Sequence, residues 1–373
     1  MSQVEQGEPA GFVKLELRTA YGPVYRDVST SPPRDASPDE IPLIDLSPIY
    51  DGDLEARKAL ARDIKHAAEK NGFFYVRNHG IAETTIQNAL SASRAFFAQS
   101  EAEKMLVSKA KGKWYNGYSA RNSAMASPSE GLDYRESFSW RYEPQYDPDP
   151  KDPDAVPVEV KPYIRGEKYV WEGTQHIPGF KTDCITYWQE CLKLARRLVR
   201  VFALCLDLPE HFFDAVTTYP GSDGVFNYYP AMSAEEAAKS EDVGLGSHTD
   251  LQCFTLLWQD MNGGLQVLNN EGQWIKATPI PGTFVVNIGD YLMRLTNDRM
   301  KSTVHRVYNR STVDRYSMPF FFGFNFNEKC GVLPSCVDEE NPAKYEPISC
   351  GDWCQLRFQQ TDMDKLDQKV AVY

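Results

Sequence analysis

The part of the chain from Val225 to Phe326 is a succession of short β-rich runs separated by turn signals. Two of these runs, Gly264 to Leu268 and Gln273 to Ala277, flank the turn Asn269-Asn270-Glu271-Gly272 and read as a hairpin. Several such short strands in a row predict a double-stranded jelly roll. This pattern constrains the fold more than any other feature of the sequence.

Helical periodicity occurs mainly ahead of these strands. Apolar residues recur at helical spacing from Asp53 to Lys70, from Glu83 to Ala98 and from Gly179 to Leu206. Asp53 is a suitable N-cap and Gly72 a suitable terminator for the first helix. The predicted fold is therefore mainly β with helices: a double-stranded β-helix (jelly roll) core backed by N-terminal and central α-helices.

The 373 residues exceed a typical domain, although a β fold with helical additions reaches this size as one unit. Residues 1–40, rich in Pro, Ser, Asp and Gly, predict an arm along the surface, and 41–373 predict one domain. Within it we expect a helical and strand part at 41–224, the jelly-roll core at 225–326 and a C-terminal lid at 327–373.

Composition excludes several classes of partner. A formal net charge of -12 leaves no basic stripe for a nucleic-acid backbone. No apolar run is long enough for a membrane span, and the first residues lack the basic start and apolar core of a secretion signal. Cys184, Cys191 and Cys205 occupy apolar helix positions, typical of reduced buried thiols. We expect a cytoplasmic protein with a small-molecule partner and no nucleic acid or membrane; the oligomeric state is unknown.

The motif Ser247-His248-Thr249-Asp250 places an imidazole and a carboxylate two residues apart on an extended segment. Residues so spaced project to the same face of a strand and can reach one ion. A second histidine, His305, lies in a matching β-rich context, in the run Ser302 to Val307. Two His and one carboxylate on one side of a metal form the facial triad of non-heme Fe(II) oxygenases. His248, Asp250 and His305 are therefore predicted metal ligands and catalytic residues.

Arg315 lies ten residues beyond His305, and Ser317 follows it by two residues on the same predicted strand. Their side chains point the same way, so that a planar guanidinium and a hydroxyl are aimed together. This pair predicts a clamp for a carboxylate.

The order of these motifs resembles the isopenicillin N synthase-like superfamily of Fe(II)/2-oxoglutarate-dependent oxygenases, from about Ile41 to about Phe358. The resemblance is carried by His248-x-Asp250, His305 and Arg315-x-Ser317, together with the segments Asn227-Tyr228-Tyr229-Pro230, Asn287-Ile288-Gly289-Asp290, Ile41 to Leu46 and Asn71 to Gly80.

The resemblance implies that Fe(II) is held at His248, Asp250 and His305. It also implies that 2-oxoglutarate is held by Arg315 and Ser317, with Tyr229 and Asn227 lining the same region. The expected reaction uses O2 and hydroxylates, desaturates or ring-modifies a small organic molecule, with release of succinate and CO2. Ascorbate is the expected reductant in vitro, and secondary metabolism the expected setting. Phe138, Phe254, Phe322 and Phe324 are candidates for the substrate wall, with core packing an equal alternative.

Two other functions stay open at this point. An oxidase or cyclase of the isopenicillin N synthase kind would use the same triad without 2-oxoglutarate, and its Arg-x-Ser pair would hold the carboxylate of the substrate. A non-catalytic jelly-roll binding protein would keep the pocket alone. Release of succinate and CO2 distinguishes the leading hypothesis, a 2-oxoglutarate-dependent oxygenase, from the oxidase or cyclase.

Overall fold

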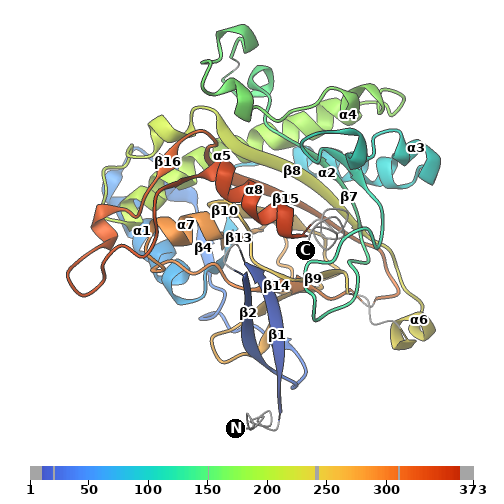
Figure 1. Cartoon of the computed structure of the whole chain (residues 1–373), viewed down its shortest axis with the longest axis horizontal. Coiled ribbons are helices and arrows are strands. Elements are labelled where there is room, and N and C mark those ends of the chain that lie inside the picture. Colours follow the sequence, from blue (N-terminus) through green and yellow to red (C-terminus); the bar gives the residue numbers. More distant parts are fainter. Residues whose placement is uncertain (1–10, 20–21, 150, 240–242, 310, 362–373) are drawn as a thin grey trace, which may run out of the picture.

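The computed structural model of the chain describes residues 11–19, 22–149, 151–239, 243–309 and 311–361. Two facing sheets form its centre (Figure 1). The major sheet has the strand order β4 (Leu43–Asp45), β5 (Phe73–Arg77), β13 (Phe284–Ile288), β10 (Phe254–Gln259), β15 (Arg315–Asn325), β8 (Pro220–Tyr229), β7 (Glu136–Trp140) and β6 (Gly117–Ser119). The minor sheet has the order β3 (Arg34–Asp35), β12 (Trp274–Lys276), β11 (Leu265–Leu268), β14 (His305–Val307) and β9 (Leu245–His248).

The two sheets are open rather than closed into one barrel, and their pairings are antiparallel except β4 with β5 and β3 with β12. The hairpin predicted between residues 264 and 277 is present as β11 and β12, with Val267 opposite Ile275. Apolar side chains of Val267, Ile275, Phe73 and Val285 pack between the sheets. The predicted jelly roll with helical additions is confirmed.

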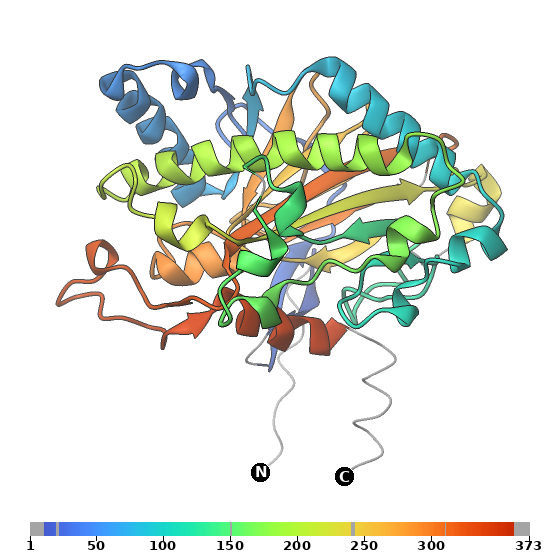
Figure 2. The ribbon, with the colours of Figure 1, turned by 90° about the horizontal axis from the view of Figure 1, so that it is seen from above.

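Helices cover the outer face of the major sheet. These are α1 (Leu54–Lys70), α2 (Glu83–Phe97) and the long α5 (Phe180–Cys205), which crosses the length of the molecule in Figure 2. All three were predicted to within about a residue at each end. Shorter helices complete the fold: α3 (Glu101–Met105), α4 (Tyr169–Glu172), α6 (Ala234–Lys239), α7 (Asp290–Leu295) and α8 (Cys350–Thr361). Among the described helices, none combines the length and apolar character of a membrane span.

The ends of α1 show why its boundaries could be predicted. The Asp53 carboxylate accepts a hydrogen bond of 2.9 Å from the Glu55 backbone amide, which satisfies a donor of the first turn. Gly72 follows the helix with a φ of 70°, and a Cβ there would lie 1.9 Å from the Lys301 carbonyl oxygen. Only glycine fits this close approach, so the chain turns directly from α1 into β5.

The N-terminal segment differs from the predicted surface arm. Residues Phe12–Thr19 (β1) and Gly22–Ser29 (β2) form an antiparallel hairpin, seen in dark blue in Figure 1. Leu15, Leu17 and Val28 of this hairpin share an apolar cluster with residues of the minor sheet. The Pro- and Ser-rich stretch that suggested an arm follows the hairpin, and β3 within it pairs with β12.

The C-terminal part contains the short strands β16 (Lys329–Cys330) and β17 (Ile348–Ser349), followed by α8. Trp353 of α8 donates a hydrogen bond of 3.0 Å to the Leu251 carbonyl oxygen, directly after Asp250. This helix therefore lies against the predicted metal site. Residues 362–373 of the predicted lid lie outside the described residues.

Candidate active site

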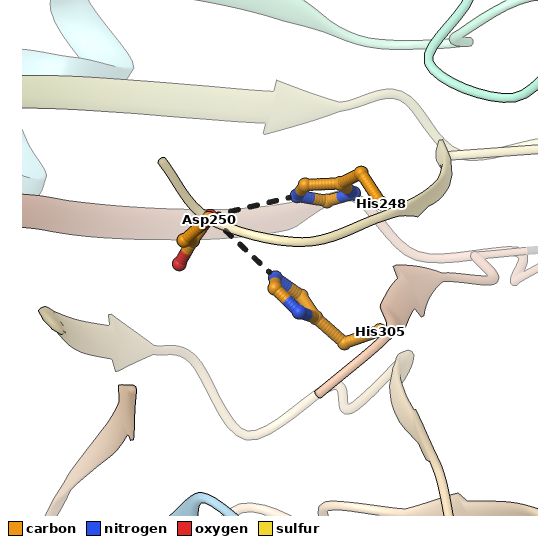
Figure 3. Close-up of side chains that lie close together, drawn as sticks. All are labelled: His248, Asp250 and His305. Carbon is orange, nitrogen blue, oxygen red and sulfur yellow. Dashed lines mark ion pairs between the residues drawn. The ribbon is translucent and has the colours of Figure 1, made fainter. Parts of the chain in front are cut away.

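Beside strands β9 and β14 of the minor sheet, the side chains of His248, Asp250 and His305 point toward one another (Figure 3). His248 ends β9 and His305 begins β14, and the two residues are direct partners in the antiparallel register. Asp250 Oδ1 lies 3.7 Å from the Nε2 atom of each histidine. One potential ligand atom from each residue lies within 4.8 Å of the other two, so the three can hold one ion.

Backbone carbonyls fix the orientation of both imidazoles. Nδ1 of His248 lies 2.8 Å from the Gly246 carbonyl oxygen, and Nδ1 of His305 lies 3.1 Å from that of Thr303. A carbonyl can only accept a hydrogen bond, so Nδ1 carries the proton and Nε2 presents its lone pair. Both histidines are thereby set to bind a metal through Nε2.

Two polar side chains hold the distal oxygen of Asp250. Asn287 Nδ2 donates a hydrogen bond of 2.7 Å to Oδ2, and the Thr255 hydroxyl donates a short one to the same atom. Oδ1, the oxygen facing the histidines, takes neither bond. The carboxylate is thus arranged to offer a single oxygen to an ion.

The electrostatics of the triad favour its metal-binding protonation state. Burial lowers the pKa of His248 to about 3, with a further contribution from His305. Burial opposes ionisation of Asp250, yet the neighbouring histidines and the bonds from Asn287 and Thr255 bring its pKa below the ordinary value. Neutral imidazole and ionised carboxylate are the forms that coordinate a cation.

The predicted clamp lies on β15, which pairs with β8 so that Arg315 faces Tyr229 and Ser317 faces Asn227. Arg315 is fully buried, and its guanidinium carbon lies 4.7 Å from the centre of the Tyr229 ring. The Gly263 carbonyl oxygen and Gln259 Oε1 accept bonds from Nε and Nη2. Nη1 is buried and has no hydrogen-bond partner.

An unpartnered N–H group of a buried guanidinium costs free energy unless a ligand satisfies it. Arg315 lines the same cavity as the triad, so the missing partner is expected to be a ligand in that cavity. The carboxylate of 2-oxoglutarate is such a partner, and two His with one carboxylate are the donor set that suits Fe(II). The residues present therefore fit both groups.

Asn227 and Tyr229, predicted to line the same region, do so from β8. Arg135, just ahead of β7, donates a hydrogen bond of 2.5 Å to Asn227 Oδ1. The structure thus brings all seven predicted metal and cosubstrate residues to one cavity of about 580 Å³.

The four phenylalanines proposed for the substrate wall lie elsewhere, which corrects that expectation. Phe138, Phe254, Phe322 and Phe324 are at most 1% exposed and belong to the core beneath the helices. Phe138, for example, packs against Phe96 of α2 and Phe180 of α5. Successive side chains of a strand alternate between its two faces. Phe254 and Phe322, for example, point into the core, while their neighbours Thr255 and Phe321 line the cavity.

Sequence reasoning missed several residues of the cavity wall. Ser137 and Ser139 line it from β7, in alternation with the buried Phe138. The signal was present, because Arg135, Ser137, Ser139 and Arg141 are polar at every second position. Other missed positions lie on the N-terminal hairpin, and they are Leu17, Arg18, Thr19, Val24 and Arg26.

A loop links this hairpin to the metal site. Glu130 of the loop accepts hydrogen bonds from the Ser247 amide, at 2.5 Å, and from Arg306, at 3.0 Å. The Glu16 amide of β1 donates a bond of 2.8 Å to the Ser129 hydroxyl. The hairpin therefore forms part of the wall beside His248, although no motif in it indicated this.

Two family models match the chain. Residues 41–161 match the model described as the N-terminal part of non-haem dioxygenases in morphine synthesis, and residues 222–324 match that of the 2OG-Fe(II) oxygenase superfamily. The second match contains the triad and the clamp.

Similar curated proteins include a 2-oxoglutarate-Fe(II) type oxidoreductase ppzC of Metarhizium majus, 46% identical over 93% of this chain and 94% of its own length. Another is the 2-oxoglutarate-Fe(II) type oxidoreductase hxnY of Emericella nidulans, 33% identical over 87% of this chain and 91% of its own length. Among solved structures, a full-length Neurospora crassa protein in complex with alpha-KG, which is 2-oxoglutarate, is 30% identical with a TM-score of 0.70 over 86% of this chain and 98% of its own. A 2OG-Fe(II) oxygenase family protein from Caulobacter crescentus is 28% identical with a TM-score of 0.72, over 86% of this chain and 99% of its own.

Proposed function

Since this chain belongs to the 2OG-Fe(II) oxygenase superfamily, we propose that it hydroxylates, desaturates or ring-modifies a small organic metabolite. It is an Fe(II)- and 2-oxoglutarate-dependent dioxygenase. The observation that carries the proposal is the convergence of three ligand atoms in a cavity that is also lined by a buried guanidinium whose Nη1 has no hydrogen-bond partner. Similarity to fungal proteins such as ppzC supports a role in secondary metabolism.

In this proposal His248, Asp250 and His305 hold Fe(II), and Arg315 and Ser317 hold the distal carboxylate of 2-oxoglutarate. Iron and 2-oxoglutarate together supply the oxidation, in which dioxygen is reduced while the keto acid becomes succinate and CO2. The protein orients the reactants and excludes water. Tyr229 packs on the Arg315 guanidinium and Asn227 extends the same wall, so both keep the clamp in place.

The test follows succinate, CO2 and oxygen consumption in the purified protein with Fe(II), ascorbate and 2-oxoglutarate. We expect one succinate for each molecule of 2-oxoglutarate consumed, and loss of both iron binding and turnover in His248→Ala and Asp250→Ala. His176→Ala is the matched control, because this exposed histidine bonds Gln99 far from the triad. Oxygen consumption without succinate would instead favour an oxidase that takes all its electrons from the substrate.

A further inference from the structure

The backbone that follows the metal ligand Asp250 is held by two helices. Three of the four carbonyl oxygens of residues 250–253 accept hydrogen bonds from amides at the start of α7: Asp250 from Asp290 at 2.7 Å, Gln252 from Tyr291 at 3.2 Å and Cys253 from Gly289 at 2.9 Å. The fourth, that of Leu251, accepts the bond from Trp353 of α8. The carbonyl groups of this segment therefore depend on α7 and α8.

The Asp290 carboxylate joins the two segments that carry the metal ligands. Its Oδ2 accepts a hydrogen bond of 3.2 Å from the hydroxyl of Thr249, which lies between two of the ligands in the sequence. Its Oδ1 accepts one of 2.7 Å from the hydroxyl of Ser302, three residues before the third ligand, His305. One side chain thus holds the backbone on both approaches to the triad.

The counter-charge of Asp290 comes from α8. Asp290 is 4% exposed, and Arg357, which is 5% exposed, places Nη2 3.6 Å from its Oδ2. Burial raises the pKa of the Asp290 carboxyl above its ordinary value, against the opposing effects of Arg357 and the two hydroxyls. Each of the two buried groups would be left as an uncompensated charge without the other.

The same face of α8 also reaches the cavity. Trp353 and Arg357 are four residues apart on the helix, so they lie on one face, and both line the cavity. From this face Trp353 contacts the backbone after Asp250, and Arg357 contacts the carboxylate that bonds Thr249, before it.

We propose that Arg357 is a positioning residue for the iron site, acting through Asp290 and Thr249. The inference rests on the proposed function, because it concerns the site that holds Fe(II). Without Arg357 the Asp290 carboxylate is buried without a cation, so it shifts toward water. Thr249 then loses its partner, and the two ligands that flank it no longer hold the spacing that one ion needs.

The experiment measures two properties of the anaerobic protein that need no turnover. Isothermal titration gives the Fe(II) affinity, and the visible absorption of the complex with Fe(II) and 2-oxoglutarate reports the coordination geometry. Arg357→Met should weaken Fe(II) binding about tenfold and shift the absorption maximum, as expected when support for metal ligands is lost. Arg357→Lys should stay within about threefold of wild type, because a contact of 3.6 Å depends on charge and not on a bidentate fork.

The second link is tested at Thr249. Thr249→Val removes the hydroxyl and should also weaken Fe(II) binding about tenfold, whereas Thr249→Ser keeps the hydroxyl and should bind as wild type does. In the double variant of Thr249→Val with Arg357→Met, the loss should stay close to that of one variant, because both changes break the same path. Independent effects would multiply to about a hundredfold.

Arg196→Met is the matched control, because Arg196 is a cation of the buried Asp147 carboxylate and lines no part of the cavity. It should lower the unfolding temperature and leave the Fe(II) affinity and the absorption unchanged. Wild-type iron affinity in either single variant, or losses that multiply in the double variant, would overturn the inference; Thr249→Val alone decides it if Arg357→Met does not fold. Failure of the wild type to bind Fe(II) would instead refute the proposed function.

Discussion

Asn287 donates a hydrogen bond of 2.7 Å to the distal oxygen of Asp250, from a strand that is not adjacent in sequence to either metal-binding segment. Asn287 is 2% exposed and lies on β13, in register with Thr255 of β10, the second donor to the same oxygen. The major sheet thus positions a carboxylate that extends from the minor sheet.

Replacing Asn287 by Ala should weaken Fe(II) binding about 10- to 100-fold, the usual loss when a group that orients a metal ligand is removed. Only Thr255 then still holds this oxygen, which can also turn toward the ion and occupy a coordination position that the cosubstrate needs. Isothermal titration with Fe(II) under anaerobic conditions measures the affinity. Asn325→Ala is the control, because this buried amide bonds the Tyr219 backbone outside the cavity. Equal iron affinity in Asn287→Ala and wild type would contradict the role.

Arg315→Gln should raise the KM for 2-oxoglutarate about 10- to 100-fold, as expected when a charge-assisted hydrogen bond to a carboxylate is lost. Iron affinity should change little, because Arg315 contacts none of the three predicted ligands. Steady-state succinate formation against 2-oxoglutarate concentration gives the value, with Arg200→Gln as a control at a partly exposed ion pair. An effect confined to the organic substrate would favour the oxidase alternative.

Phe138→Ala should reduce the free energy of unfolding by about 3–5 kcal/mol, the range for removing a large aromatic side chain from a packed core. Phe138 is fully buried among Phe96, Phe180 and Trp140. Urea unfolding followed by circular dichroism measures the change. At a temperature where the variant is folded, its KM for 2-oxoglutarate should stay within twofold of the wild-type value. A large rise in KM with little loss of stability would instead indicate that Phe138 lines the cavity.

Glu40 should make a pH-dependent contribution to stability. The bidentate bond from Arg34 lowers its pKa from 4.5 to about 2, against an opposing effect of burial and with further bonds from Ser37 and Asn269. Because the folded-state pKa is depressed, the contribution is complete above pH 4.5 and is lost as the pH falls toward 2. Solvent screening limits it to about 1 kcal/mol. Unfolding of wild type and Glu40→Gln between pH 2 and 6 should show curves that converge at low pH; parallel curves would rule the contribution out.

The sequence by itself determined the jelly roll, the three long helices and the order of the metal and clamp motifs. Each of these rests on local rules: the two-residue period of a strand, the helical period, and the capping of α1 by Asp53. Spacing within one strand also fixed that Arg315 and Ser317 share a face.

Only the tertiary structure decided which face of each strand points into the cavity. The choice between cavity and core for Phe138 and Ser137 depends on which side of the major sheet the helices cover, and alternation alone leaves the two sides equivalent. Tertiary structure also decided that the N-terminal hairpin packs on the minor sheet, and that Arg141 forms an ion pair with Asp223. These contacts join segments that are far apart in the chain, and no local propensity encodes them, because they exist only once both sheets are packed.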